Sequence, residues 1–257
     1  MLDLCPVHRR MPFTLCHPAA LAALPARVRS RLPLAALAIG TMTPDFEYLL
    51  RLKPFSVLSH TVPGLFLFCV PIGLLTWLAW EHIARGPTRE LLALRDRRGP
   101  EPMGSAMLIR AAIAILIGAA THLGWDAFTH SGRLGAALIP QLEVEAWRIG
   151  SYSMPWFSVM QHLSTVAGAC VLGLWFLHER KKYGVPVEWT VAARTLLAVA
   201  TIGLLAGALN AFTPHLVGHA RYPGTMALLA RFVVGAMVGV GASLLVYGAI
   251  RTRERAV

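Results

Sequence analysis

Five long stretches without a single Asp, Glu, Lys or Arg residue constrain this chain more than any other feature. They cover residues 54–80, 111–125, 149–178, 195–220 and 232–250. A helix needs about 20 mostly apolar residues to cross the hydrocarbon core of a bilayer. We therefore expect five transmembrane helices, over residues 62–80, 106–128, 162–177, 191–212 and 225–250. Because 56% of the 257 residues are hydrophobic and 14% are charged, the composition excludes an ordinary soluble domain.

The expected fold class is an all-α polytopic membrane helix bundle. Its formal net charge of +11 comes mostly from basic residues in short connections, a distribution typical of membrane orientation, so no nucleic acid is expected as a partner. The connections after the first and third helices and the tail contain five, three and three Lys or Arg, and the other connections two and one. By the positive-inside rule, we expect a multi-pass inner (plasma) membrane protein with a cytoplasmic C-terminus.

The first 61 residues form a region of their own, with a short helix expected around residues 19–30. An apolar run follows from Leu32 to Met42, about half the length of a membrane span. It is either a re-entrant or interfacial helix or a short sixth crossing, and both alternatives stay open. The chain thus divides into an N-terminal helical region (1–61), a core of three helices (62–178) and two further transmembrane helices (179–257).

One segment of the second expected helix carries a chemically distinctive pattern. His122, Asp126 and His130 follow one another at i, i+4 spacing within an apolar sequence. Side chains at this spacing share one face of a helix. An ionised carboxylate near the bilayer centre costs at least about 2.5–3.5 kcal/mol, so Asp126 needs a partner. A cluster of imidazole and carboxylate groups indicates a divalent metal ion.

The expected topology brings further polar residues to the same end of the bundle. Asp45 and His60 precede the first helix. The second helix ends near His122 and Asp126, and the third begins at His162. Because successive helices alternate in direction, these ends all lie on the outward side. Neutral imidazole and carboxylate groups are typical ligands of zinc, with manganese and iron as alternatives.

Each of these residues also has a structural explanation. Asp45 could complement a helix that begins at Thr43-Pro44, and His60 could be an interfacial histidine at a helix entry. His122 and Asp126 could form a buried hydrogen-bonded pair. The joint pattern favours a functional site over such a structural network.

Three more residues are candidates for a supporting role. His130 and His162 lie nearer to helix ends, and Glu47 is two residues from Asp45. We expect them to contact substrate or to hold the ligands in place. The glycine- and proline-containing connection over residues 129–161 has the length of a lid or cover over the outer helix ends.

Several short motifs occur in an order that resembles an uncharacterised bacterial membrane protein family, catalogued as domain of unknown function 4184. These are MPFT at 11–14, HPA at 17–19, TPDFEY at 43–48, SH at 59–60, GLF at 64–66, TH at 121–122, WD at 125–126, FTH at 128–130 and QH at 161–162. The resemblance covers residues 11–177. Members of the family begin at the MPFT segment, which makes Met11 an alternative to Met1 as the true start.

A more distant resemblance links the chain to the inner-membrane metal-dependent hydrolases, which in turn look like zinc-dependent phospholipase C. It rests on His17, Pro44-Asp45, Ser59-His60-Thr61 and the Thr121-His122-xxx-Asp126 helix. That family carries two histidines and an Arg-Gly pair where this chain has only His60, which speaks against a full second metal site. The resemblance implies that His17 is a further ligand.

Together these observations favour a membrane-embedded metal-dependent hydrolase that acts on a phosphoester or other lipid-derived substrate at the outer interface. The expected metal ligands are a subset of His17, Asp45, His60, His122 and Asp126. Asp126 or Asp45 would be a ligand or the general base for a metal-activated water. Two other classes stay open, namely a small ion or proton-coupled transporter and a non-enzymatic protein with a structural metal.

Overall fold

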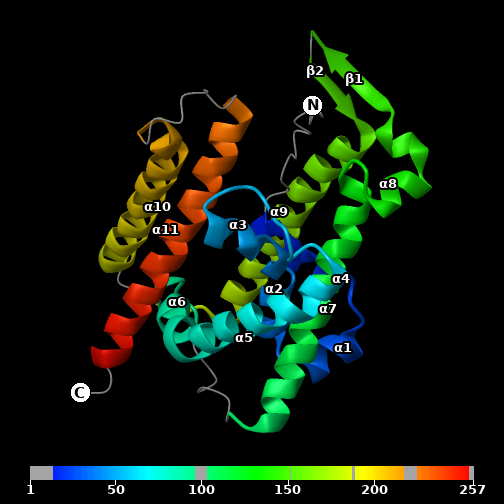
Figure 1. The fold of residues 1–257 in the computed structure, drawn as a ribbon. Helices are drawn as coiled ribbons and strands as arrows, with labels where there is room; N and C mark the ends of the chain where they lie inside the picture. Colours follow the sequence, from blue (N-terminus) through cyan, green and yellow to red (C-terminus); the bar gives the residue numbers. More distant parts are fainter. Residues whose placement is uncertain (1–13, 96–102, 151, 187–188, 217–224, 255–257) are drawn as a thin grey trace.

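Five helices of the computed structural model are long and apolar enough to cross a membrane, which confirms the predicted all-α polytopic bundle. They are Val62–Leu91, Ser105–Thr129, Trp156–Tyr183, Thr190–Thr213 and Ala227–Glu254. The structure describes residues 14–95, 103–150, 152–186, 189–216 and 225–254. Figure 1 shows the long helices side by side, with the shorter N-terminal elements packed among them.

The first long helix is a series of segments. These are α4 (Val62–Gly64), a π-helical stretch (Leu65–Cys69), α5 (Val70–Ala79), a second π-helical stretch (Trp80–Ala84) and α6 (Arg85–Leu91). Pro71 has no N–H and its ring clashes with the carbonyl group four residues back, which explains a widened turn before it. The helix runs eleven residues beyond the predicted end at residue 80, and within this extension Glu81 and Arg85 form an i,i+4 ion pair at 3.1 Å.

The N-terminal region consists of short elements that enter the bundle and return. They are a 3-10 helix (Thr14–Ala23), α1 (Ala26–Arg31), α2 (Leu34–Gly40), a second 3-10 turn (Thr43–Asp45) and α3 (Phe46–Arg51). The single helix expected over residues 19–30 is therefore wrong. Pro25 occupies the N-cap position of α1 and separates it from the 3-10 helix.

Contacts with α7 (Ser105–Thr129) show how deep this region reaches. The His17 ring stacks on His122 of α7, while the Arg31 carbonyl group accepts hydrogen bonds from Arg110, and the Thr41 carbonyl group lies beside His122 again. Arg110 and His122 are twelve residues apart, about 18 Å along a helix. The N-terminal region thus runs from the level of His122 to the level of Arg110 and back again, which favours the re-entrant alternative over a sixth crossing.

Close packing holds the re-entrant segment in place. A Cβ atom at Gly118 of α7 would lie 2.4 Å from the Leu37 carbonyl oxygen, and one at Gly40 of α2 would lie 2.5 Å from the Ile115 carbonyl oxygen. Such small residues let helix backbones approach closely in a membrane. Leu37 and Ile115 are fully buried in the same core cluster. This contact fixes the depth in the bundle at which the segment after α2 lies.

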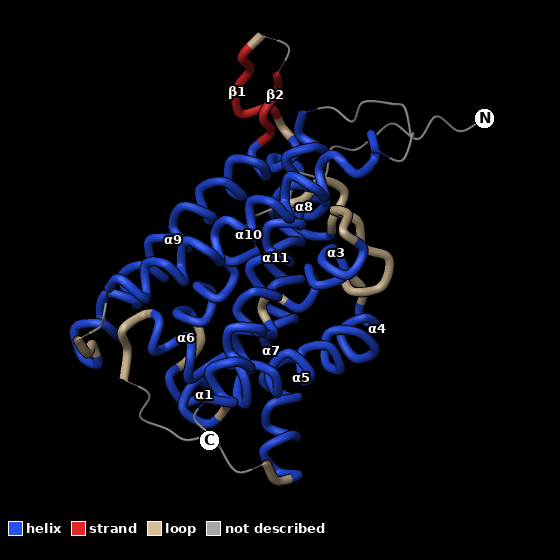
Figure 2. The backbone as a smooth tube through the Cα atoms, turned by 90° about the vertical axis from the view of Figure 1, so that its left-hand side faces the viewer, coloured by secondary structure: helices blue, strands red, loops and turns tan. Residues whose placement is uncertain are grey.

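The connection after α7 contains α8 (Leu134–Leu138), a 3-10 turn (Pro140–Glu143) and a hairpin of β1 (Glu145–Ile149) and β2 (Tyr152–Pro155). It ends earlier than predicted, because α9 (Trp156–Tyr183) begins directly after Pro155, six residues before His162. Figures 1 and 2 show the hairpin projecting from the end of the bundle. The hairpin therefore does not fold over the helix ends, and the prediction of a cover is wrong for this part of the connection.

The last two helices, α10 (Trp189–Leu216) and α11 (Thr225–Glu254), form a hairpin beside the rest of the bundle (Figure 1). A polar clip joins them, since the Asn210 side chain donates to the Arg231 carbonyl group at 2.7 Å and Arg231 donates to the Asn210 carbonyl group at 3.0 Å. A Cβ atom at Gly248 would lie 2.5 Å from the Ile83 carbonyl oxygen, so α11 packs closely on the first long helix. This hairpin contributes none of the predicted ligands.

Candidate metal centre

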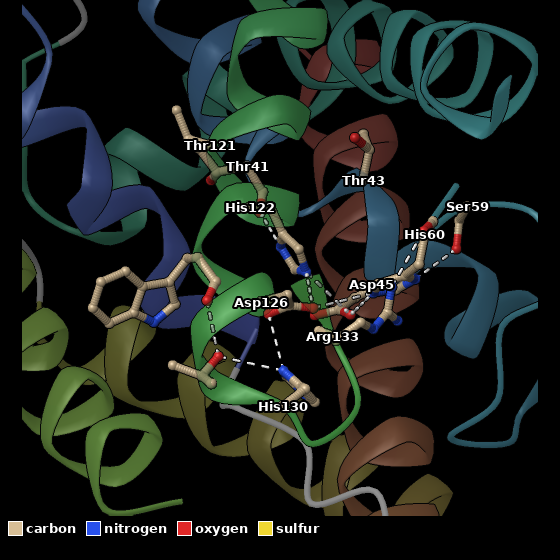
Figure 3. A network of polar contacts seen from close by, with 12 residues as sticks. Thr41, Thr43, Asp45, Ser59, His60, Thr121, His122, Asp126, His130 and Arg133 are labelled. Carbon is tan, nitrogen blue, oxygen red and sulfur yellow. Dashed lines mark hydrogen bonds and ion pairs between the residues drawn. The ribbon is translucent and has the colours of Figure 1, made fainter. Parts of the chain in front are cut away.

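Five predicted ligand side chains from separate parts of the chain meet inside the bundle. His17 comes from the first 3-10 helix, Asp45 from the second, His60 from the segment before α4, and His122 and Asp126 from α7. All five residues are at most 9% exposed. Figure 3 shows the Asp45, His60, His122 and Asp126 side chains pointing toward one another. The convergence inferred from helix direction is therefore present in the structure.

Four atoms form the centre of this cluster. The His122 Nε2 atom lies 3.4 Å from Asp126 Oδ2 and 3.7 Å from Asp45 Oδ1. The His60 Nε2 atom lies 3.5 Å from Asp45 Oδ1 and 3.6 Å from Asp126 Oδ2. These separations exceed the usual N–H···O range of about 2.7–3.2 Å. Four ligand atoms placed tetrahedrally around a zinc ion, each about 2.1 Å away, would lie about 3.4 Å apart.

Several buried polar atoms of the cluster lack a hydrogen bond. Among the residues that the structure describes, the His17 Nε2, His122 Nε2 and Asp126 Oδ1 atoms have no hydrogen-bond partner. A buried polar atom without a partner costs about 1–3 kcal/mol, so such atoms are rare and generally have a reason. Three such atoms in one cluster make these residues candidates for holding a further group.

The orientation of His122 is set by its other ring nitrogen. The Nδ1 atom lies 2.8 Å from the Thr41 carbonyl oxygen, which can only accept a hydrogen bond. Nδ1 therefore carries a proton and donates, so that when the ring is neutral its lone pair is on Nε2, which faces the cluster. Metal-binding histidines are commonly oriented in this way by a backbone carbonyl group. The re-entrant segment thus lies next to the candidate ligands and also supplies the carbonyl group that orients His122.

His60 is held by neighbours on both sides of its ring. Its Nδ1 atom lies 3.0 Å from the Ser59 hydroxyl oxygen, and the Tyr48 hydroxyl oxygen lies 3.4 Å from Nε2. Tyr48 also stacks on the ring, with centroids 5.4 Å apart. Tyr48 was not a predicted site residue. Its position three residues after Asp45, on the same side of the turn, is the signal that could have identified it.

Glu47 supports the cluster through the backbone. Its carboxylate accepts hydrogen bonds from the amide groups of Val57 at 3.0 Å, Leu58 at 3.1 Å and Ser59 at 2.8 Å, and from Arg51 at 2.8 Å. Burial raises the pKa of this carboxyl group, but the hydrogen bonds from Ser59, Val57 and Arg51 lower it more, to about 2. The ionised carboxylate therefore fixes the loop that leads into His60.

We expect Glu47→Gln to lower the free energy of unfolding by about 1–3 kcal/mol, because charge-assisted hydrogen bonds to three amide groups are lost or weakened. Metal affinity should fall by about 10–100-fold, the usual cost of disturbing groups that orient ligands. Thermal unfolding and zinc titration of the purified protein would measure both effects. Glu145→Gln, on the exposed hairpin, is the control. Equal behaviour of the two variants would contradict the supporting role of Glu47.

The charge states of the two ligand candidates outside the long helices suit metal binding. Burial and the neighbouring His122 lower the pKa of His17 to about 4, so its ring is neutral at neutral pH. Burial raises the pKa of Asp45, but the neighbouring His122 and His60 rings lower it more, so the net shift is downward. Asp45 is therefore ionised. Neutral imidazole and ionised carboxylate are the forms that bind metal.

Two predicted supporting histidines have different positions. His130 follows the end of α7, and its Nδ1 atom lies 3.6 Å from Asp126 Oδ1, at the edge of the cluster. His162 is exposed on α9, whereas the neighbouring Gln161 is buried. One residue along a helix rotates the side chain by about 100°, so α9 turns His162 away from the bundle interior. The expectation that His162 takes part in the site is therefore not supported.

Arg133, one of the two basic residues in the connection after α7, lies beside the cluster. Its Nη1 atom is 3.5 Å from the His60 carbonyl oxygen, and Figure 3 draws it with the residues of this polar network. The turn that presents it has Gly132 at a φ of 68°, a left-handed conformation that favours glycine. The Gly132 amide group donates to Glu143 at 2.9 Å, which fixes the turn. This turn could not be recognised from the spacing of the ligands.

The fold and the buried cluster define a polytopic membrane protein with an internal His/Asp centre. Residues 11–249 match the family model described as Domain of unknown function (DUF4184), and the chain belongs to this family. The match reaches well past residue 177, so the last two helices are part of the family domain, which the sequence resemblance did not include. Comparison with the curated proteins found no match, and comparison with the solved structures found none either.

Proposed function

We propose that this protein is a membrane-embedded, metal-dependent hydrolase that cleaves a phosphoester bond in a lipid-derived substrate. The observation that carries the proposal is the buried set of two imidazole nitrogens and two carboxylate oxygens, in which each nitrogen lies 3.4–3.7 Å from each oxygen. Ligands of this kind at this spacing suit a zinc ion, and manganese and iron use similar groups.

The residues present fit such an ion. His60, His122 and Asp126 form one possible group of ligands, and His17, Asp45 and His122 form another, so a subset of these five residues would hold it. The His17 ring stacks on His122, with centroids 3.9 Å apart. When bound, a divalent ion lowers the pKa of a coordinated water and polarises a phosphoryl oxygen. Asp126 or Asp45 would accept the proton as general base when it is not fully engaged as a ligand.

The surroundings of the cluster support an anionic, lipid-derived substrate. Arg133 lies at the edge of the site, and a guanidinium group can bind a phosphate group through two hydrogen bonds. The cluster residue Asp126 is three residues from the end of α7, about 5 Å along the helix, which is compatible with the headgroup region of a bilayer. A purely structural metal would need neither feature.

We further propose that the protein lies in a bacterial inner (plasma) membrane with the C-terminus in the cytoplasm and the cluster toward the outward side. The re-entrant path supports this orientation. It places Arg31 beside Arg110, at the end of α7 that follows the arginine-rich connection. Basic residues of the N-terminal region therefore gather at the same end as the other basic connections, in agreement with the positive-inside rule.

Hydrolysis of a phosphatidate in mixed micelles tests the function, with phosphate release as the readout and added zinc or manganese. We expect Arg133→Gln to lower kcat/KM by about 10–100-fold, since a charge-assisted contact contributes about 1.5–3 kcal/mol, and to leave metal content unchanged. Arg148→Gln removes an equal charge from the exposed hairpin and should have little effect. Absence of turnover by metal-loaded protein would contradict the hydrolase and favour a structural metal.

A further inference from the structure

A second candidate site lies at the other end of the bundle. A cavity of about 1010 Å³ separates α1 and the start of α2 from the first long helix and from the second half of α9. Arg110 lines it, twelve residues before His122 on α7, about 18 Å from the level of the His/Asp cluster. The cavity is at the upper end of the size range of small-molecule sites, about 300–1,000 Å³.

The charged residues that line this cavity leave an excess of positive charge. Among the residues that the structure describes, four arginines and two glutamates contribute to its wall: Arg29, Arg85, Arg89, Arg110, Glu81 and Glu179. Arg85 pairs with Glu81 at 3.1 Å, and Arg89 lies 4.0 Å from Glu179. Arg110 donates to the Arg31 carbonyl group. Neither Arg110 nor Arg29 forms an ion pair with a described carboxylate. The two uncompensated guanidinium groups favour an anionic ligand.

An apolar hollow continues from the same wall. A smaller cavity of about 350 Å³ shares Arg29, Leu34, Trp175 and Glu179 with the larger one. It extends along the first 3-10 helix, where its wall is formed by Pro18, Ala19, Leu21, Ala22 and Val171. The combined space thus has a cationic part and an apolar part. Trp80 and Trp175 line the cationic part, and tryptophan is typical of the membrane–water interface.

We propose that this space binds an anionic phospholipid of the surrounding membrane, with the headgroup phosphate between Arg29 and Arg110 and an acyl chain in the apolar hollow. A free phosphate or another soluble anion would occupy only the cationic part and leave the apolar part empty, whereas a phospholipid fills both parts. The site is distinct from the His/Asp cluster and its occupation does not depend on the proposed hydrolysis. A lipid at this position would pack between the re-entrant segment and α9.

Binding of phosphatidylglycerol to the purified full-length protein in detergent, followed by native mass spectrometry, tests the proposal. We expect Arg29→Gln with Arg110→Gln to weaken binding about thirtyfold, because each arginine near an anionic lipid contributes a factor of about five. Arg27→Gln with Arg31→Gln is the matched control. It removes the same charge from neighbouring positions that do not line the cavity, and it should retain at least a third of the affinity.

A second variant guards against a folding defect in the first. Ala22→Trp fills the apolar hollow and keeps both arginines, so it should also weaken binding of phosphatidylglycerol. Equal loss in both arginine pairs, equal binding of phosphatidylcholine, or full displacement by millimolar inorganic phosphate would overturn the proposal. Metal content should stay at the wild-type level in all these variants, which separates this site from the cluster.

Discussion

Asp126→Asn is expected to abolish metal binding while the protein still inserts and folds. The Asp126 carboxylate is 4% exposed, and its Oδ2 atom lies 3.4 Å from His122 Nε2 and 3.6 Å from His60 Nε2. An amide of the same shape removes the negative charge that holds a divalent cation, so affinity should fall by more than about 100-fold. Without metal, Asp126→Asn should be no less stable than the wild type stripped of its metal, because a buried charge without its ion is costly.

Elemental analysis of the purified protein measures this effect directly. The wild type should carry close to one metal ion per chain, and Asp126→Asn less than about a tenth of that. His162→Asn is the control, because it removes a histidine that is exposed on α9. Added zinc should raise the unfolding temperature of the wild type and of His162→Asn, but not that of Asp126→Asn. Unchanged metal content in Asp126→Asn would count against the cluster as the binding site.

Gly118→Ala is expected to cause a large loss of stability for a single methyl group added to α7. The new Cβ atom would lie 2.4 Å from the Leu37 carbonyl oxygen and 2.7 Å from the Thr41 amide nitrogen, so α2 would have to move away from α7. Such overpacking costs about 1–3 kcal/mol or more. The Thr41 carbonyl group orients His122, and a displaced α2 should therefore weaken metal binding as well.

Gly124→Ala provides a matched control on the same helix. A Cβ atom at Gly124 has no neighbour within 4 Å, and alanine favours a helix over glycine by about 0.5–1 kcal/mol. The two substitutions should thus shift the unfolding temperature in opposite directions. Thermal unfolding in detergent, with and without zinc, would measure both. A Gly118→Ala variant as stable as Gly124→Ala would show that α2 does not pack on α7 as described.

The membrane-spanning helices could be predicted because the bilayer dictates their length and composition. Their ends could not, since apolar sequence marks only the hydrocarbon region. The first long helix continues through the Glu81–Arg85 ion pair to Leu91, and α9 begins at Trp156 because Pro155 sets its start.

The meeting of Asp45, His60, His122 and Asp126 followed from helix direction and i, i+4 spacing alone. The path of residues 14–51 did not, because it depends on the contact between Gly40 and Gly118, which are far apart in the sequence. Arg133 reaches the cluster through a turn whose shape depends on Gly132 and Glu143. Tertiary packing and turn geometry of this kind leave little trace in hydropathy or spacing.

X-ray absorption at the zinc edge of the protein as purified would show whether the His/Asp cluster holds a metal ion. We expect nitrogen and oxygen neighbours at about 2.0–2.1 Å, with outer-shell scattering typical of imidazole, and loss of this signal in His122→Asn. A shell of sulfur atoms at about 2.3 Å would contradict it, and so would a protein that binds no divalent metal at all.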